Sequence, residues 1–249
     1  MFSGYQCTRC GEVYPPDKPV YLCPHDGAVL DVTYDWVSLK PQQIQSSAEK
    51  SMWRYLPLLP VADPGLHATP LRRAGWTPIY ELPTLSQEVG LRQLWLKDEG
   101  LNPTASFKDR ASALVVARAA EIGASVIVTA STGNAGAALA GSAAAAGKAA
   151  VIFAPAKALP AKVAQLLVYG ARVFLVKGSY DDAVLLSQQA AEEFGWYCRN
   201  TGYNPFTIEG KKTAAFEIWE QLIDTGNAPD AIFVPVGDGN IISGIHKGL

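Results

Sequence analysis

A regular alternation of short apolar segments with longer helical patterns, between residues 112 and 194, is the feature that most constrains the fold of this chain. The apolar segments resemble buried strands and lie at 125–130, 149–154 and 172–176. The helical patterns lie at 112–122, 133–146, 160–169 and 180–194. Short strands that alternate with helices predict an α/β fold, in which a parallel sheet is covered by helices on both faces.

The composition fits a folded protein that has neither a nucleic-acid nor a membrane partner. Of the 249 residues, 49% are hydrophobic and 18% are charged, which is enough apolar material for one or two compact domains. The net charge of −2 provides no basic surface for nucleic acid or for an anionic membrane. A small anionic substrate is compatible with this charge, because it needs only a local pocket of amides and cations.

The N-terminal sequence and the cysteine content predict a cytoplasmic protein. Residues 1–7 lack the basic segment and apolar core of a secretory signal. The most apolar stretch, 134–150, is too short to span a bilayer and contains Lys148. The 4 cysteines of this chain are too few for a disulfide scaffold.

Lys108 lies where a loop becomes a helix. A short apolar strand ends near Leu96, residues 100–106 interrupt regular structure with Gly, Asn, Pro and Ser, and an Ala-rich helix follows. Asp109 falls in the first helical turn, where the positive helix end stabilises a carboxylate. A lysine beside the aromatic ring of Phe107 suits Schiff-base chemistry, because desolvation helps its amine to lose a proton. A surface lysine at a helix start is the alternative.

Two further loops each follow a predicted strand and precede a predicted helix. Residues 131–134 (STGN) follow the strand at 125–130, and residues 237–241 (GDGNI) follow a second apolar segment, 231–236, which we predict to be a buried strand. Amides at a helix N-terminus bind anions, and glycines let a phosphate approach the backbone closely. An ordinary helix cap or a tight turn would produce the same short patterns.

The N-terminal segment has the pattern of a degenerate zinc ribbon. Cys7 and Cys10 form a CxxCG knuckle, in which two thiolates and nearby amides hold one side of a metal ion. Cys23 is followed by His25 and then by Asp26, which occupies the place of a fourth cysteine. The candidate ligands for a structural zinc ion are therefore Cys7, Cys10, Cys23 and His25. A module that holds no metal is the alternative.

Several of these segments, in the same order, resemble motifs of the fold-type II pyridoxal-phosphate (PLP) enzymes, and of the threonine synthase family in particular. Residues 103–110 (PTASFKDR) resemble the PLP lysine motif PTGSFKDR, with Ala105 where the family usually has glycine. The other similar segments are 131–134 (SxGN), 204–213 (NPxxxEGxKT, a loop entering an amphipathic helix), the glycine-rich loop 237–241, and, outside the site, 53–60 (WRYLPLLP) and 75–80 (GWTPIY). The resemblance thus runs from about residue 53 to the last residue.

The resemblance implies a PLP site and a reaction. Lys108, beside Phe107, would hold the cofactor as an internal aldimine and transfer protons. The other residues implied to contact the cofactor are Asn134, at the ring hydroxyl, and Gly237, Asp238, Gly239, Asn240 and Ile241, at the phosphate. The residues implied to bind the substrate carboxylate are Ser131, Thr132 and Gly133. The implied reaction converts O-phospho-L-homoserine and water to L-threonine and phosphate.

The resemblance also implies the domain organisation. Residues 1–35 would form the zinc-ribbon-like module, 111–225 a smaller α/β domain, and 36–110 with 226–249 a larger PLP domain, the last two each with a three-layer parallel sheet. The family pattern leads us to expect a further stretch after Leu249, which would complete the larger domain and supply the partner of the pyridine nitrogen. Without that stretch we expect exposed apolar surface on the larger domain. The resemblance favours a homodimer.

Three other interpretations stay open from the sequence. A PLP-dependent serine or threonine dehydratase, or a β-replacement enzyme such as cysteine or cysteate synthase, would use the same site. A truncated relative without catalytic activity would keep the motifs but bind PLP weakly or not at all. A zinc-ribbon binding module would depend on the N-terminal cysteines alone.

Overall fold

The computed structural model describes residues 2–37, 47–223 and 226–249, and it confirms the predicted α/β fold. Its central element is a parallel sheet of four strands in the order β8-β7-β6-β9. The strands are β6 (Val126–Ala130), β7 (Ala149–Pro155), β8 (Arg172–Val176) and β9 (Tyr197–Cys198). β6 and β7 occupy the middle of the sheet and are mostly buried, as their apolar sequences predict.

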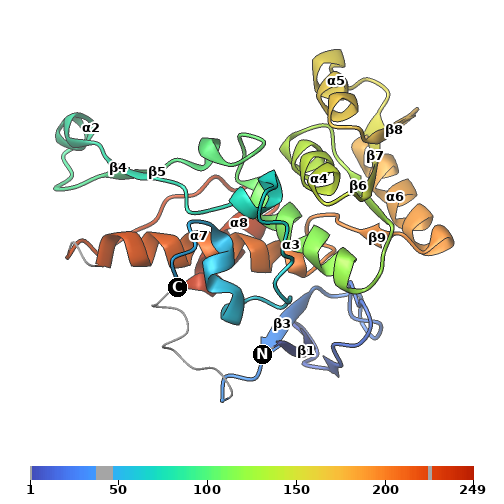
Figure 1. Cartoon of the computed structure of the whole chain (residues 1–249), viewed down its shortest axis with the longest axis horizontal. Coiled ribbons are helices and arrows are strands. Elements are labelled where there is room, and N and C mark those ends of the chain that lie inside the picture. Colours follow the sequence, from blue (N-terminus) through green and yellow to red (C-terminus); the bar gives the residue numbers. More distant parts are fainter. Residues whose placement is uncertain (1, 38–46, 224–225) are drawn as a thin grey trace.

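Helices cover both faces of this sheet (Figure 1). α4 (Asn134–Ala145) and α5 (Pro160–Val168) lie on one face, and α6 (Tyr180–Phe194) lies on the other. The chain forms β6, β7 and β8 in one direction and then returns through α6, which places β9 on the opposite side of β6. The strand order therefore reverses between β6 and β9, and open parallel sheets bind their ligands at the carboxyl ends of the strands at such a point.

α6 has the boundaries that the sequence predicts, and both of its ends show why. The hydroxyl of Ser179 accepts a hydrogen bond from the amide of Asp182 (3.1 Å), and the carboxylate of Asp182 accepts one from the amide of Ser179 (2.7 Å). This reciprocal capping begins the helix. Gly195, in the left-handed conformation with a φ of 65°, ends it.

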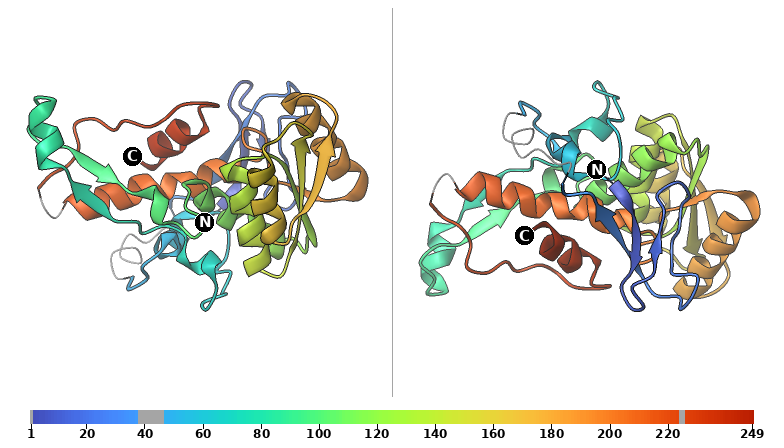
Figure 2. Two further views of the ribbon diagram at one scale, coloured as in Figure 1. Left: turned by 90° about the horizontal axis from the view of Figure 1, so that it is seen from above. Right: turned by 90° about the horizontal axis from the view of Figure 1, so that it is seen from below.

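Three further helices pack together beside the sheet. α7 (Phe206–Ile223) is the long helix that crosses the molecule, and α3 (Lys108–Glu121) and α8 (Asn240–Gly248) both contact it (Figure 2). A methyl group at Gly210 would lie 2.3 Å from the carbonyl oxygen of Arg110, so glycine permits the contact of α7 with α3. Because α7 already begins at Phe206, most of the 204–213 motif lies inside the helix and not in a preceding loop.

The N-terminal module is a small antiparallel sheet that contacts α7 and α8. Its strands, in the order β2-β1-β3, are β1 (Phe2–Cys7), β2 (Val13–Tyr14) and β3 (Leu30–Tyr34). The hydroxyl of Tyr34 donates to Glu209 and accepts from Lys212, and both of these side chains are buried on α7. Lys247 of α8 forms ion pairs with Glu209 (2.6 Å) and with Asp31 of β3 (2.5 Å). A cluster of charges therefore joins the module to the helices.

A two-stranded antiparallel hairpin projects from the opposite end of the molecule (Figure 1). It consists of β4 (Ile79–Glu81) and β5 (Trp95–Lys97), which are connected through α2 (Pro83–Glu88). Short 3-10 helices precede and follow it: η1 (Met52–Leu58), η2 (Pro70–Arg73) and η3 (Glu99–Leu101). None of the helices in the described ranges is long and apolar enough to cross a membrane.

The prediction of a buried strand at 231–236 is wrong. These residues have no regular secondary structure, and within the described part of the chain no strand pairs with them. Phe233 is 87% exposed and Val236 is 61% exposed. An apolar sequence forms a strand only where a second segment lies about 4.8 Å away and completes the backbone hydrogen bonds, and none of the described segments does so here.

The turn before α3 contains a strained residue. Ala105 has a φ of 57°, in the left-handed region that disfavours any residue with a Cβ atom. A hydrogen bond from the Ala105 amide to the carbonyl of Asn102 (2.8 Å) closes the turn in this conformation. The strain explains physically why glycine suits this position of the PTGSFKDR motif.

We expect Ala105→Gly to stabilise the chain by about 0.5–1 kcal/mol. Removal of the methyl group relieves about 1–2 kcal/mol of strain, while glycine adds about 0.5–1 kcal/mol of backbone entropy cost. Ala156→Gly is the matched control, because Ala156 is also an exposed loop residue but does not have a positive φ, so glycine should destabilise there. Urea unfolding compares the three proteins. Equal destabilisation by both substitutions would show that Ala105 is not strained.

Candidate active site

Lys108 is the first residue of α3, and a rigid turn precedes it. The hydroxyl of Ser106 accepts a hydrogen bond from the Lys108 amide (3.1 Å) at the start of the helix. The carboxylate of Asp109 accepts hydrogen bonds from the amide and the hydroxyl of Thr104, at 2.8 and 2.7 Å. These bonds fix the backbone on both sides of the lysine, whose side chain is only partly buried.

The surroundings of Lys108 favour a neutral amine. Partial burial lowers the pKa of Lys108, the charge of Arg199 lowers it further, and Asp238 opposes both effects. The neutral amine is the form that attacks a carbonyl carbon, so this environment suits the Schiff-base chemistry that the sequence predicts. Arg199 follows β9 and Asp238 lies in the 237–241 loop, so three segments that are distant in sequence meet at this lysine.

Arg110 lies at the centre of a buried ion-pair network. Its fully buried guanidinium donates two hydrogen bonds to Glu99, both of 2.7 Å, and two to Glu217, of 2.5 and 2.7 Å. The hydroxyls of Thr213 (3.0 Å) and Thr77 (3.3 Å) accept further bonds from it. Burial disfavours the charge, but the two carboxylates outweigh this effect and raise the pKa of Arg110.

Glu217 extends this network to the segment before the hairpin. It accepts hydrogen bonds from the amides of Trp76 (2.7 Å) and Thr77 (3.3 Å) and forms an ion pair with Lys97 (2.7 Å). Burial opposes its ionisation, but Arg110 and Lys97 lower the pKa of Glu217. The network thereby holds α3, α7 and β5 in fixed relative positions, and Lys108 with them.

The 131–134 loop lies at the carboxyl end of β6, where the strand order reverses. The Ser131 amide donates to the carbonyl of Phe153 (3.1 Å), and the Ser131 hydroxyl accepts a hydrogen bond from the Gly133 amide (3.1 Å). The next residue, Asn134, begins α4 and has an exposed side chain. The loop therefore presents a helix N-terminus and partly exposed backbone, as an anion-binding loop requires.

The 237–241 loop leads into α8 and has open space beside its glycines. Gly239 precedes the helix with a φ of 76°, and the carboxylate of Asp238 accepts a hydrogen bond from the amide of Asn240 (3.0 Å). A methyl group at Gly237 or Gly239 would meet no atom within 4 Å. This space adjoins the first-turn amides of α8, so it can admit a phosphate group.

Two further cations lie near these loops, and sequence reasoning did not select them. Arg199 directly follows β9, Lys211 lies on α7, and both are fully buried. Arg199 donates to the hydroxyls of Ser112 (3.2 Å) and Thr201 (2.7 Å), and the ammonium of Lys211 donates to the side chain of Asn240. The adjacent lysines of the 204–213 motif could have indicated Lys211. Nothing in the sequence indicates Arg199, because its place depends on the return of the chain to β6.

Lys108, and not Lys211, is the amine that a carbonyl compound can reach. Burial, and then the charges of Arg199 and Lys108, lower the pKa of Lys211 to about 6. Burial lowers the pKa of Lys108 as well, so the direction of the pKa shift does not distinguish the two amines. Lys211 is completely buried and bonded to Asn240, whereas Lys108 is partly exposed, so access selects Lys108.

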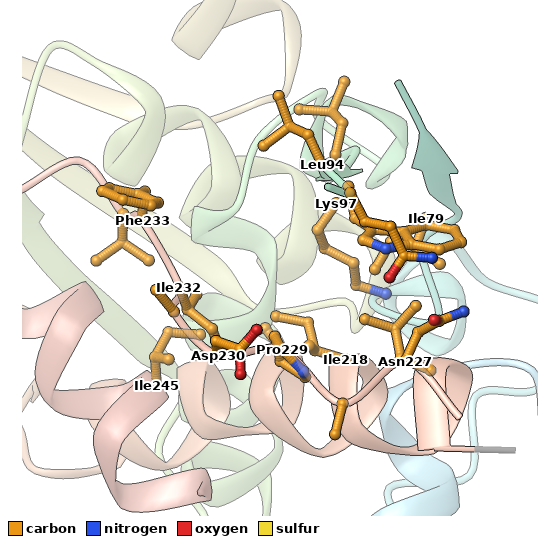
Figure 3. A pocket seen from close by; sticks show the side chains of 18 of the residues that line it. Ile79, Leu94, Lys97, Ile218, Asn227, Pro229, Asp230, Ile232, Phe233 and Ile245 are labelled. Carbon is orange, nitrogen blue, oxygen red and sulfur yellow. The ribbon is translucent and has the colours of Figure 1, made fainter. Parts of the chain in front are cut away.

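A separate apolar cleft of about 560 Å³ lies between the hairpin, α7 and residues 227–235 (Figure 3). Ile79 and Leu94 lie on the hairpin side, Ile218 lies on α7, and Phe233 lies on the opposite side. Lys108, Arg199 and Lys211 do not line this cleft, but Phe107 does. Phe107 was predicted to lie beside the cofactor. It lines the apolar cleft and directly precedes Lys108, so the cleft lies next to the start of α3.

The N-terminal cysteines form a cluster with a different fourth member from the one proposed from the sequence. The potential ligand atoms of four residues lie within 4.8 Å of one another: Cys7, Cys10, Cys23 and Asp26. The sulfurs of Cys10 and Cys23 are 3.7 Å apart, and the thiol of Cys7 donates to Asp26 at 3.4 Å. The amide of Ala28 donates to the same carboxylate (2.9 Å), which holds Asp26 inward, while His25 is exposed and lies outside the cluster.

The residues at Lys108 fit PLP, which is an aromatic aldehyde with a phosphate group. Lys108 provides an accessible amine, and the 237–241 loop provides open space at a helix N-terminus. Between the described residues, Nη2 of the buried Arg199 has no hydrogen-bond partner, as expected where an anion binds. The charges of Arg199 and of Asp238 in the loop both shift the pKa of Lys108, and Asp238 also raises the pKa of Arg199.

Fold and site together are those of a PLP-dependent α/β enzyme. A family model described as pyridoxal-phosphate dependent enzyme matches residues 71–249, so the chain belongs to this family. Its architecture is that of the fold-type II members, as two solved structures illustrate. A PLP-dependent aspartate racemase matches with a TM-score of 0.62 and 30% identity, over 72% of this chain and 55% of that chain. A T.th. threonine deaminase matches with a TM-score of 0.62 and 28% identity, over 70% of this chain and 55% of that chain.

Within the family, the chain is similar to threonine synthases. It is 41% identical to a threonine synthase of Methanocaldococcus jannaschii over 248 residues. This alignment covers 98% of this chain and 60% of the relative. It is 39% identical over 246 residues to a threonine synthase of Methanosarcina acetivorans, which covers 98% and 59%. The chain therefore spans about three fifths of the length of these relatives.

We expect Arg110→Met to lower the free energy of unfolding by about 3–5 kcal/mol at pH 7, because it leaves two carboxylates buried without their guanidinium. Arg172→Met is the control, since Arg172 is exposed on β8, and it should change the free energy by less than about 0.5 kcal/mol. Urea unfolding measures both changes. A loss of the same size in the control would show that the buried network has no special role.

We also expect the difference between wild type and Arg110→Met to shrink in acid. Burial raises the pKa of Glu99 and Glu217, but Arg110 outweighs burial and lowers both. The pKa of a glutamate in the unfolded chain is about 4.3. As the pH decreases below this value, the unfolded wild type binds more protons than the folded state, so the free energy of unfolding decreases. The Arg110→Met variant lacks the guanidinium that lowers these two pKa values, so it does not lose stability in this way. A difference that stays constant between pH 7 and pH 3 would contradict the argument.

Proposed function

We propose that this chain forms the PLP site of a threonine synthase, which converts O-phospho-L-homoserine and water to L-threonine and phosphate. The observation that carries the proposal is Lys108, a partly exposed amine at the start of α3, whose pKa is lowered by burial and by Arg199. The identity of about 40% to threonine synthases supports the choice of reaction.

The residues of the site would divide the chemistry among them. PLP, when bound, supplies an electron sink that stabilises negative charge at the substrate carbon next to the amino group. Lys108 would hold the cofactor until the amine of the substrate displaces it. The freed amine of Lys108 would then take the proton from that carbon and deliver protons to neighbouring carbons. The backbone of Ser131, Thr132 and Gly133 would bind the substrate carboxylate. Asn134 would contact the ring hydroxyl, and residues 237–241 would surround the cofactor phosphate.

A serine or threonine dehydratase, or a β-replacement enzyme, would use the same residues and is the second candidate function. Similar solved structures include a threonine deaminase and a cysteine synthase of Entamoeba histolytica, so the fold alone does not select the reaction. Inorganic phosphate released from O-phospho-L-homoserine supports threonine synthase. Ammonia released from serine or threonine, without phosphate release from O-phospho-L-homoserine, would favour the dehydratase.

We expect PLP to give the chain a visible absorbance band that Lys108→Ala abolishes. Borohydride reduction followed by peptide mass mapping should find the cofactor on Lys108. Lys148→Ala is the matched control, because Lys148 donates to the Ala124 carbonyl (2.8 Å) at the far end of α4, and it should keep the band. Cofactor found on Lys211 would overturn the choice between the two amines, and the absence of a band in the wild type would refute PLP binding by this chain.

We also propose that Cys7, Cys10, Cys23 and Asp26 bind a structural zinc ion. Bond lengths of about 2.3 Å to sulfur and 2.0–2.2 Å to oxygen place neighbouring ligands of a tetrahedral zinc about 3.5–3.8 Å apart. The observed separations of 3.7 Å (Cys10 to Cys23) and 3.4 Å (Cys7 to Asp26) are close to these values. The amides of Arg9 and Cys10 both donate to the Cys7 sulfur at 3.4 Å, as they would to a metal-bound thiolate.

We expect the purified chain to contain one zinc ion, and Asp26→Ala to weaken zinc binding by at least about tenfold. His25→Ala should leave the affinity unchanged, because His25 is exposed and outside the cluster. With cobalt in place of zinc, Asp26→Cys should increase the sulfur-to-metal charge-transfer band by about one third, in proportion to four thiolates in place of three. Metal loss in His25→Ala, but not in Asp26→Ala, would identify histidine as the ligand.

A further inference from the structure

Buried positive charge is concentrated in the site beyond what Lys108 requires. The charge of Arg199 lowers the pKa of both Lys108 and Lys211, and the charge of Lys108 also lowers the pKa of Lys211. Asp238 is the carboxylate whose charge acts on all three cations. Asp238 itself is exposed at the end of its loop. Burial of several cations with little compensating charge is unfavourable, and a bound anion would remove the imbalance.

Arg199 is held so that one of its nitrogens has nothing to bind. Its backbone amide donates to the Val128 carbonyl (2.8 Å), and its side chain donates through Nε to Ser112 (3.2 Å) and through Nη1 to Thr201 (2.7 Å). Nη2 is buried and has no acceptor in the described parts of the chain. An oxygen of an anion at this position would satisfy it.

Lys211 connects the same group of charges to the N-terminus of α8. Its ammonium donates to the side-chain oxygen of Asn240, the first residue of that helix. The hydroxyl of Thr207, one turn earlier on α7, contacts the same oxygen (3.4 Å) and fixes its direction. The open space beside Gly239 immediately precedes Asn240, so an anion in that space would lie at both the helix N-terminus and the ammonium.

We propose that Arg199 and Lys211, together with the N-terminus of α8, bind the dianionic phosphate of a phosphate monoester. The proposal deepens the proposed function and rests on it for the source of the phosphate, which is either the cofactor or the phosphorylated substrate. Phosphate offers three acceptor oxygens, enough for Nη2 of Arg199, the ammonium of Lys211 and the amides of α8. Its negative charge also favours the protonated form of Lys211. Lys211 is then a binding residue and not a second nucleophile.

The first test compares PLP with pyridoxal, which lacks the phosphate, by absorbance titration of the 249-residue chain. Lys211→Met should reduce the affinity for PLP by about 10- to 100-fold and leave the affinity for pyridoxal within about threefold, because only the charge-assisted bond to phosphate is lost. Lys162→Met, at an exposed position of α5, removes the same charge elsewhere and should change neither affinity. This result identifies the phosphate as that of the cofactor.

The second test identifies a substrate phosphate. In that case Lys211→Met leaves the preference for PLP over pyridoxal intact. Instead it reduces the preference of the PLP-loaded chain for O-phospho-L-homoserine over L-homoserine by the same factor, measured from the spectral change on binding. If neither preference changes, Lys211 binds no phosphate and the proposal is wrong.

Two additional measurements separate this proposal from misfolding and from the proposed function. Lys211→Arg keeps the charge and should keep the phosphate preference, whereas loss of preference in both variants would attribute the effect to packing and overturn the proposal. Inorganic phosphate should raise the Tm of the wild type and of Lys162→Met, but not of Lys211→Met. If PLP binds to none of the proteins while this protection persists, the proposed function fails and the phosphate site stands. Equal protection of all three proteins would refute the site.

Discussion

The position of the reactive lysine depends on the guanidinium of Arg110, two residues further along α3. This group forms paired hydrogen bonds with Glu99 and with Glu217, two carboxylates from segments more than a hundred residues apart. A buried ion pair is weak evidence for net stability, because desolvation offsets much of the attraction. Its geometric effect is stronger, since the planar guanidinium satisfies both carboxylates in one arrangement only. Any shift of α3 against α7 would break these bonds, so the backbone of Lys108 at the start of α3 is held in place.

The 204–213 motif shows how one helix serves several neighbours at once. Successive residues of α7 point in different directions, so each contacts another part of the molecule. Gly210 permits the approach of α3, Thr213 accepts a bond from Arg110, and Glu209 with Lys212 binds Tyr34 of the N-terminal module. Lys211 and Thr207 are directed at Asn240 and the start of α8. The motif therefore reflects assembly of the molecule more than catalysis.

The sequence predicts the parts of the fold that depend on local patterns. The strands β6, β7 and β8 follow from apolar runs, and the ends of α6 follow from the cap at Ser179 and from Gly195, all of which act within a few residues. The short strand β9 was not predicted. The segment 231–236 was mistaken for a strand because strand formation depends on a partner that a local pattern does not reveal. Arg199 joins the site only because β9 pairs with β6, and Asp26 replaces His25 only because of the geometry of its turn.

Burial gives the two lysines of the site similar chemistry and different uses. Desolvation lowers the pKa of both Lys108 and Lys211, and the charge of Arg199 lowers both further. The pKa values therefore do not decide which lysine is the nucleophile. Lys108 begins a helix and is partly exposed, so an aldehyde can reach it. Lys211 lies in the middle of α7, closed in by α8 where Gly244 permits contact with its Cβ, so only its charge can act on a ligand. A phosphate bound near both would raise both pKa values, and the exposed amine would still be the only one that reacts.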